Sequence, residues 1–309
     1  MKILLTGVSS FTGYWIAKAV AQAGYEICCP LTGDGSYEGV RKNRMEALPQ
    51  SVHIVRHAAF GTESFIRLIR DFRPDALCHH GAYVKNYRSP DFDMLAAVAN
   101  NTKEIGDVLN CFVSGSGRLF LITGTVFEAN EGQGELPRRA FSLYGLSKTL
   151  SSQIFEYYAV VNEVTFGKFV IPNPFGVYEE PRFTAYLMKT WKGSKPAGVN
   201  TPAYIRDNIP VDLLASCYVR FLDNLLSNSR LRQAIVRPSG YVETQGQFAE
   251  RVAKEVRSRT GLPCVLELSE QTQFPEPRVR FNDQAARDMI PNWDERLFWD
   301  NFIDYYTIR

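Results

Sequence analysis

The chain has 309 residues, which is enough for one large domain or for a large domain with a smaller one. Hydrophobic residues make up 45% and charged residues 22%, as in an ordinary globular protein, and the formal net charge is only +2. So small a net charge argues against nucleic acid or an anionic membrane as a partner, and no apolar run approaches the roughly 20 residues of a membrane span. A local basic pocket for a phosphate-bearing small molecule stays compatible with this composition.

The first residues, Lys2 to Leu5, predict a short strand and lack the long apolar segment and cleavage site of a signal peptide. The cysteines lie in apolar stretches and have neither metal-ligand nor disulfide-framework spacing. They are Cys28, Cys29, Cys78, Cys111, Cys217 and Cys264. Buried free thiols are typical of a reducing compartment. We therefore expect a cytoplasmic protein without a metal site.

Short apolar runs alternate with amphipathic segments over the first 170 residues. Strands are predicted at 2–5, 26–31, 52–55, 76–80, 119–123 and 164–170. Helices are predicted over about a dozen residues from Phe11 and at 62–71, 92–112 and 142–160. This regular alternation predicts an α/β Rossmann fold, a doubly wound parallel sheet with helices on both faces.

After Pro172 the alternation ends, and proline and glycine punctuate a loop-rich stretch. Helical patterns return at 211–226 and 244–257. We expect the C-terminal third to form a smaller, irregular α/β lobe that closes over the first.

A glycine-containing turn follows the first strand and opens the first helix, with Gly7, Ser9, Ser10, Phe11 and Gly13 in it. At this place the pyrophosphate of a dinucleotide meets free backbone N–H groups and the positive end of a helix dipole. Gly7 permits the tight turn and Gly13 lets the helix pack on the sheet, whereas Ser10 takes the usual position of a third glycine. The spacing alone is weak evidence, but its place after an N-terminal strand predicts a dinucleotide site.

The end of the second predicted strand bears on which dinucleotide binds. An acid that would bind the ribose hydroxyls is missing there, where Thr32 follows Pro30 and Leu31, and Arg41, Lys42 and Arg44 come soon after. A missing carboxylate with nearby cations favours a 2′-phosphate, and hence NADP over NAD. A solvated basic helix face explains the same cations equally well.

Tyr144 and Lys148 lie one helical turn apart, on one face of a predicted helix. A tyrosine with a pKa near 10 becomes a usable base when a cation and an oxidised nicotinamide stand beside it. Tyr14 and Lys18 share this spacing, but they lie beside the phosphate loop. Thr123 ends the fifth predicted strand, at the sheet edge where ligands bind, so its hydroxyl can bond the reacting oxygen.

Together these motifs resemble the extended short-chain dehydrogenase/reductases, specifically the nucleotide-sugar epimerase/dehydratase group. The resemblance rests on Thr-Gly-x-x-x-Phe-x-Gly at 6–13, Thr-x-x-Val-Phe at 123–127 and Ser-x-Tyr-Gly-x-Ser-Lys at 142–148. It implies that His80, Gly81 and Ala82 line the cofactor together with Thr32 and Arg41, and that Asn100 stabilises its helix. It also implies substrate contacts from Tyr83, Thr125, Asn173 and two diphosphate-binding arginines, Arg206 and Arg278. Loop residues Lys85, Tyr87, Arg182 and Lys189 are further candidates.

The resemblance also implies an organisation. Residues 1–170 with about 201–230 would form the NAD(P)-binding domain, and 171–200 with 231–309 the substrate lobe. Helices at 92–112 and 142–160 would pair in a homodimer through a four-helix bundle. The substrate implied is a nucleotide-diphosphate sugar.

Two departures from the family pattern bear on the reaction. Gly124 and Thr125 stand where 4,6-dehydratases carry an Asp-Glu pair, which argues against dehydration. His57-Ala58-Ala59 replaces the usual adenine-binding Asp. We expect an epimerase that transiently oxidises a sugar carbon, C4, with an NADPH-dependent 4-keto-6-deoxy-sugar reductase as the alternative. Two further hypotheses are a non-catalytic NAD(P)-sensing protein and a dehydrogenase of small alcohols or ketones.

Overall fold

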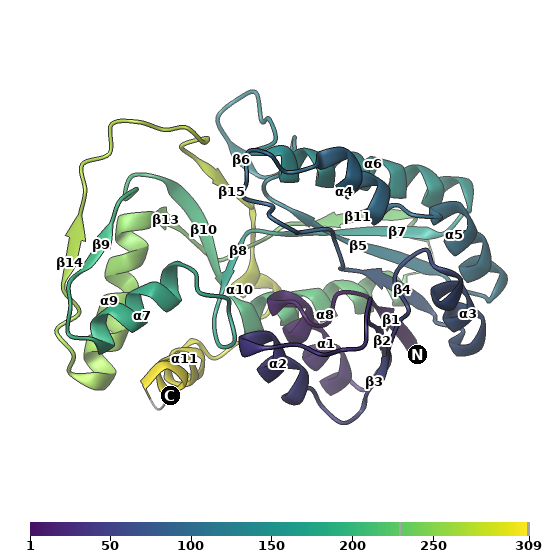
Figure 1. Ribbon diagram of the computed structural model, residues 1–309, viewed down its shortest axis with the longest axis horizontal. Coiled ribbons are helices and arrows are strands. Elements are labelled where there is room, and N and C mark those ends of the chain that lie inside the picture. Colours follow the sequence, from purple (N-terminus) through teal and green to yellow (C-terminus); the bar gives the residue numbers. More distant parts are fainter. Residues whose placement is uncertain (229, 308–309) are drawn as a thin grey trace.

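The computed structural model describes residues 1–228 and 230–307 and contains a seven-stranded parallel sheet at its centre (Figure 1). The strand order is β11-β7-β5-β4-β1-β2-β3. The strands are β1 (Lys2–Leu5), β2 (Glu26–Pro30), β3 (Val52–Val55), β4 (Ala76–His79), β5 (Leu119–Thr125), β7 (Thr165–Ile171) and β11 (Gln233–Val236). The order reverses between β1 and β4, and such a switch point is where open α/β sheets bind ligands. The predicted doubly wound Rossmann fold is confirmed.

Helices cover both faces of this sheet, because successive strand residues point to opposite sides. Leu5 packs with α1 (Phe11–Gln22) and α8 (Val211–Ser227), and α2 (Gly39–Glu46) lies beside α1. Leu4 packs on the other face, in the cluster formed with α3 (Glu63–Phe72), α5 (Ile105–Ser114) and α6 (Leu143–Val161). α4 (Met94–Asn101) lies against α6.

The helix predicted over 92–112 is two helices, α4 and α5. Glu104, between them, has a left-handed φ of 49°. The backbone of Gly61 approaches this break so closely that a Cβ there would lie 2.1 Å from the carbonyl oxygen of Lys103. The apolar pattern continues across the break, so periodicity alone did not reveal it.

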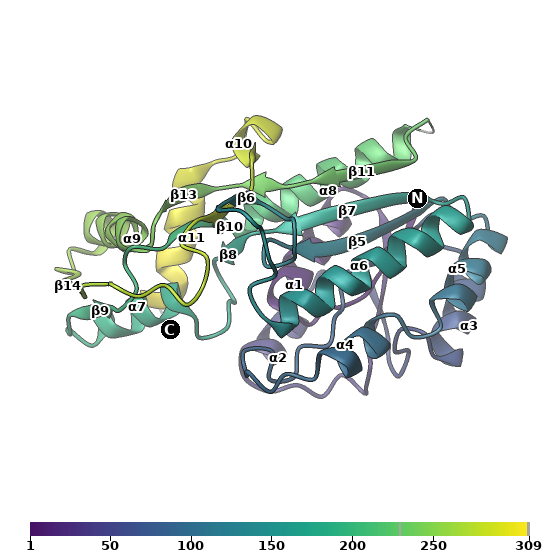
Figure 2. The same cartoon turned by 90° about the horizontal axis from the view of Figure 1, so that it is seen from above.

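The second lobe has its own apolar core and lies beyond the carboxyl ends of the parallel strands (Figure 2). α7 (Phe183–Lys192), α9 (Gln245–Thr260) and α11 (Glu295–Thr307) pack around Phe175, Trp191 and Trp299. Three strands form its main sheet, in the order β13 (Tyr241–Thr244), β10 (Ile205–Pro210) and β8 (Asn173–Phe175). Small ladders join β14 (Leu266–Leu268) to β9 (Ala197–Val199), β15 (Arg280–Phe281) to β6 (Gln133–Gly134), and β12 (Pro238–Ser239) to β16 (Gln284–Ala285), which precedes α10 (Ala286–Met289).

Strand pairing places two segments differently from the expected division. β10 falls within 201–230 but pairs with β8 and β13 of the second lobe, whereas β11 falls within 231–309 but pairs with β7 of the parallel sheet. The chain therefore returns to the parallel sheet twice after β7, once for α8 and once for β11. Among residues 1–228 and 230–307, no helix combines the length and apolar character needed to cross a membrane.

Candidate active site

A cavity of about 710 Å³ opens at the carboxyl ends of β1, β2, β4 and β5, a size suited to a small-molecule ligand. Its wall runs from the turn after β1 past 30–32 and 79–82 to 123–125, and then to Tyr144 and Lys148 on α6. Residues 171, 172, 174 and 180–182 close it from the side of the second lobe. The turn, the end of β2 and the residues Thr123, Tyr144 and Lys148, all predicted from sequence to form the site, thus share one cavity.

The turn after β1 is shaped for close backbone approach. Gly7 has a φ of 79°, and a Cβ on it would lie 2.8 Å from the backbone nitrogen of Gly81. A Cβ on Gly13 would lie 2.1 Å from the carbonyl oxygen of Gly7. Ser10 caps α1: its Oγ accepts from Gly13 N (3.1 Å) and donates to Gly7 O (2.8 Å). The opening of α1 lines the cavity, so this turn fits a pyrophosphate.

Two arginines of the basic cluster take up different positions at the end of β2. Arg41 lines the cavity beside Thr32, donates to Ser9 Oγ (3.0 and 2.6 Å) and lies over the Tyr37 ring. Arg44 is 1% exposed and donates to Ser9 O, Tyr178 O and Glu180. Burial lowers the pKa of Arg44, and Glu180 opposes that shift. Arg44 is therefore not part of a solvated face. Arg41 is exposed although it lines the cavity, and Lys42 is exposed and pairs with Glu46, so a solvated face still accounts for these two cations.

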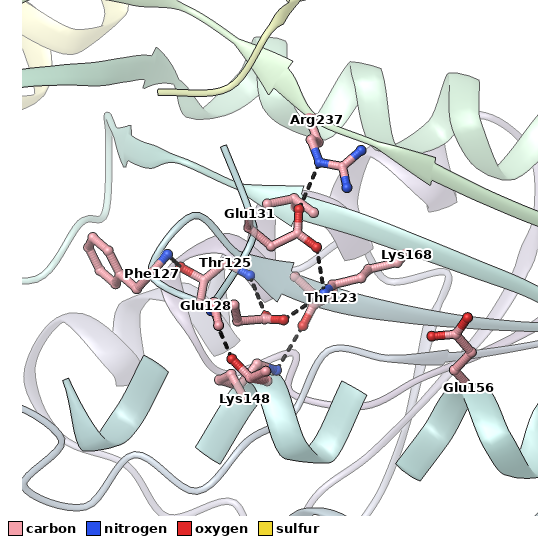
Figure 3. Close-up of polar contacts among 12 residues, drawn as sticks. Thr123, Thr125, Phe127, Glu128, Glu131, Lys148, Glu156, Lys168 and Arg237 are labelled. Carbon is pink, nitrogen blue, oxygen red and sulfur yellow. Dashed lines mark hydrogen bonds and ion pairs between the residues drawn. The ribbon is translucent and has the colours of Figure 1, made fainter. Parts of the chain in front are cut away.

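Thr123, Tyr144 and Lys148 come together at the opposite end of the cavity. Lys148 Nζ donates to the main-chain oxygen of Thr123 at 2.7 Å (Figure 3). Tyr144 packs against Tyr87, with ring centroids 5.2 Å apart. Burial, then Glu128 and Tyr87, raises the pKa of Tyr144 well above its ordinary value, whereas burial lowers the pKa of Lys148. Near pH 7 Tyr144 is thus a neutral phenol, one helical turn from Lys148.

His80 joins the phosphate turn to the catalytic strand. Its Nδ1 shares a hydrogen bond with Thr123 Oγ1 (3.0 Å), and its Nε2 lies 2.9 Å from Thr12 Oγ1 and 3.1 Å from Ser10 Oγ. Burial, then Lys148, lowers the pKa of His80 to about 3, so the ring is neutral near pH 7. Beyond lining the cavity, as Gly81 and Ala82 also do, His80 orients the Thr123 hydroxyl.

The asparagine next to the expected one makes the helix contacts. Asn101 is buried, accepts from Tyr83 N (2.7 Å) and donates to Ser151 Oγ on α6 (3.3 Å). Asn100 lines the cavity without a recorded hydrogen bond. The sequence pattern does not distinguish the two neighbours, because both end α4.

The structure does not bring the two expected diphosphate arginines to the cavity. Arg206 is buried, and its guanidinium donates to the carbonyl oxygens of Ile205, Pro277 and Arg278 and to Glu276. Arg278 is exposed and lies over the Phe274 ring. Both guanidinium groups are held by the second lobe itself, so neither reaches the site.

Of the other residues expected to contact substrate, some line the cavity and some do not. Thr125, Tyr87 and Arg182 line the cavity. Asn173 does not, although its neighbours Pro172 and Pro174 do; its amide donates to Asp207 O. Tyr83, Lys85 and Lys189 are also outside the cavity wall.

Sequence analysis missed a buried group of charges beneath the catalytic strand. Lys168 on β7 donates to Glu128 (2.6 Å) and Glu131 (2.7 Å), and Glu131 also accepts from Arg237 (Figure 3). Lys168, Glu128 and Glu131 are 7%, 1% and 5% exposed. A lysine inside an otherwise apolar strand, with two acids just after β5, was the available signal.

Solved structures with the same fold span essentially the whole chain. A UDP-glucose-4-epimerase from Stenotrophomonas maltophila, with bound NAD and formylated UDP-arabinopyranose, is 17% identical, with a TM-score of 0.77 and coverage of 100% of this chain and 98% of that one. A UDP-glucuronic acid 4-epimerase from Bacillus cereus, in complex with UDP-glucuronic acid and NAD, is 17% identical, with a TM-score of 0.76 and coverage of 100% and 99%. A UDP-glucose 4-epimerase from Thermotoga maritima, with UDP-glucose, is 15% identical, with a TM-score of 0.73 and coverage of 100% and 99%.

At such identities these likenesses establish the fold alone. No curated protein matches the chain by sequence. Residues 3–231 match the family described as the NAD dependent epimerase/dehydratase family, which is well over half of the chain. The phosphate turn, the Tyr144–Lys148 pair and the strands of the parallel sheet other than β11 lie in that matched region, and the chain therefore belongs to the NAD dependent epimerase/dehydratase family.

Proposed function

We propose that the protein is a nucleotide-diphosphate-sugar epimerase that transiently oxidises the sugar at C4. The observation that carries this proposal is the convergence of Thr123, Tyr144 and Lys148 on the cavity that the phosphate turn also lines. The solved relatives named above, two of which carry NAD and all of which carry UDP-sugars by their descriptions, support the same class of substrate.

The chemistry assigned to the chain's own residues is a proton transfer. A bound oxidised nicotinamide supplies a hydride acceptor and a positive charge. Tyr144 would take the proton of the sugar hydroxyl as the carbon loses hydride. After the keto sugar has rotated, Tyr144 would return that proton as the same carbon regains hydride on its opposite face. Lys148, one turn further along α6, favours the phenolate form of Tyr144. Thr123 Oγ1, oriented by His80, bonds the reacting oxygen.

An NADPH-dependent reduction of a 4-keto-6-deoxy sugar is the second candidate. It is favoured by the cavity-lining Arg41 beside Thr32, a position suited to a 2′-phosphate. We expect Arg41→Ala to weaken NADP binding about tenfold and NAD binding little, since a charge-assisted bond contributes about 1.5–3 kcal/mol. Titration calorimetry with both dinucleotides measures this, and equal losses for both would remove the argument for NADP.

A panel of UDP- and dTDP-sugars, incubated with and without NAD(P)H, separates the two reactions. An epimerase interconverts two sugars with no net loss of dinucleotide. Substrate-dependent, stoichiometric loss of NADPH would establish the reductase instead. No conversion of any sugar, with tight dinucleotide binding, would favour a non-catalytic sensor.

We also propose a cytoplasmic homodimer that pairs through α4 and α6. Their outer faces expose Leu95 (73%), Tyr157 (65%) and Val160 (65%), and the six cysteines are free thiols, as a reducing compartment favours. Sedimentation velocity should give a dimer that Val160→Asp converts to a monomer. A wild-type monomer at micromolar concentration contradicts the pairing.

A further inference from the structure

The carboxylate of Glu128 is fixed by bonds to two elements at once. Its Oε1 accepts from Thr125 N (2.8 Å), at the end of β5, and its Oε2 accepts from Lys168 Nζ (2.6 Å), on β7 (Figure 3). The residue is 1% exposed. Arg280 donates to its main-chain oxygen (3.4 Å) and to that of Glu131 (2.7 Å), which holds the loop that carries both acids.

This carboxylate lies on the face of the sheet that α6 covers. Lys168 is in register with Ile122, whose side chain packs with Phe155 of α6. Gly124 is two residues further along β5 and so points to the same face. A Cβ on it would lie 2.6 Å from Lys168 Cε and 2.9 Å from Glu128 Oε1. The Glu128–Lys168 pair therefore fills the space beside Gly124, beneath the helix that carries Tyr144 and Lys148.

Lys148 has no ion-pair partner among the described residues, since its one recorded bond is to the carbonyl of Thr123. Apart from Glu128, the titratable groups that act on Lys148 are cationic or neutral. They are Lys168 on β7 and the imidazoles of His79 and His80 at the end of β4. Tyr144 packs against the rings of Tyr87 and Phe92, and Arg182 is the cation that acts on it electrostatically. Glu131 is shared between Lys168 and Arg237. Lys148 donates to Thr123 O (2.7 Å) and Glu128 accepts from Thr125 N (2.8 Å), so the two side chains hold neighbouring peptide groups at the end of β5. Glu128 is thus the carboxylate that this strand end brings beside the buried ammonium.

We infer that Glu128, shared with Lys168, is also the counter-ion of Lys148, and so a positioning residue that acts on the Tyr144–Lys148 pair from the end of β5. This inference rests on the proposed roles of Tyr144 and Lys148.

The effect of Glu128 on the two groups has a definite sign. Burial lowers the pKa of Lys148 and Glu128 opposes that shift, so loss of the negative charge lowers the pKa further. Burial raises the pKa of Tyr144 and Glu128 adds to that shift, so loss of the charge lowers this pKa also. Both groups of the pair should therefore titrate at lower pH in Glu128→Gln.

The direct test is an NMR titration of protein labelled with [ε-13C]lysine, with the Lys148 signal assigned by Lys148→Met. We expect Glu128→Gln to lower the Lys148 pKa by about one to three pH units, as for loss of a nearby opposite charge. Glu131→Gln is the matched control: it removes the other carboxylate on Lys168 and should leave Lys148 unchanged. Equal titration of Lys148 in wild type and Glu128→Gln overturns the inference.

A second variant covers the case in which Glu128→Gln does not fold. Lys168→Met with Glu131→Gln removes the cation that shares Glu128, together with that cation's second partner. Glu128 then faces Lys148 without competition, and the Lys148 pKa should rise. An unchanged pKa in this folded variant also contradicts the inference.

Activity gives an independent measurement. If the proposed function holds, both limbs of the pH profile of kcat move to lower pH in Glu128→Gln, whereas a merely structural role would lower the maximum and leave the limbs in place. Failure of the proposed function would appear as wild-type protein inactive on every sugar or as full turnover by Tyr144→Phe. Neither result alters the lysine titration, so the two failures are distinguishable.

Discussion

The two halves of the cavity wall were predictable to very different degrees. The half built by β1, β4, β5 and α6 carries the phosphate turn, His80, Thr123, Tyr144 and Lys148, all expected there and all found at the cavity. The half that faces the second lobe was expected to carry Arg206 and Arg278, and it carries neither; it carries Arg182, a further candidate from sequence, and Glu180, which was not predicted. Parallel strands deliver their following residues to one edge of the sheet by topology, whereas loops of the second lobe obey no such rule.

The largest expected effect tests the half that was predicted. Tyr144→Phe removes the phenolic proton carrier but keeps the ring that packs on Tyr87. We expect kcat to fall about 10²–10⁴-fold, the usual contribution of a positioned acid–base, with dinucleotide binding largely retained. Steady-state kinetics on the best nucleotide sugar measures it. Undiminished turnover would remove Tyr144 from the chemistry.

The next effect concerns stability and tests Arg206, which was expected to bind a diphosphate but is buried in the second lobe. Arg206→Ala leaves the carbonyl oxygens of Ile205, Pro277 and Arg278 without their donor, so we expect the free energy of unfolding to fall by about 1–3 kcal/mol. The exposed Arg278→Ala is the control and should change stability little. Urea unfolding measures both. If Arg206→Ala kept full stability and instead raised KM for the sugar, Arg206 would bind substrate after all.

A smaller effect is expected for the cation that does line the second half. Arg182 lies 3.8 Å from Glu180 and is partly exposed at the cavity. Because a charge-assisted contact at such a place is weakened by water, we expect Arg182→Ala to raise KM only about tenfold, with kcat nearly unchanged. Lys189→Ala, on helix α7, which begins directly after Arg182, but outside the cavity wall, is the matched control. Identical KM values for the two variants would argue against a substrate contact.

The smallest effect concerns the loop that carries Glu180 and Arg182. Burial raises the pKa of its neighbour Glu179 from 4.5 to about 7, opposed by hydrogen bonds from Thr184 and from Tyr306 of α11. The folded state therefore binds this proton more firmly than the unfolded state, and stability falls as pH rises from about 4.5 to 7. Glu179→Gln removes this pH dependence. The Tm of the variant relative to that of the wild type should therefore rise by a few degrees when the pH is raised from 5 to 8. A Tm difference independent of pH would show that Glu179 titrates normally.

The same contrast explains what was missed. Glu128 and Glu131, just after β5, lie 40 and 37 residues before Lys168 of β7, and the β5–β7 pairing brings the three charges together. Sequence analysis noted Gly124 as a missing acid, yet the structure shows that the Glu128–Lys168 pair takes the space a side chain there would need. A local pattern reports on its own element and not on what packs against it.

The sequence by itself determined the alternation of strands and helices, the phosphate turn and the Tyr144–Lys148 spacing, because each depends on residues within one or two elements. The tertiary structure alone decided which asparagine anchors α4, where Arg206 and Arg278 point, and which carboxylates pair with Lys168. These features depend on distances between segments far apart in the chain, and no local periodicity encodes such distances.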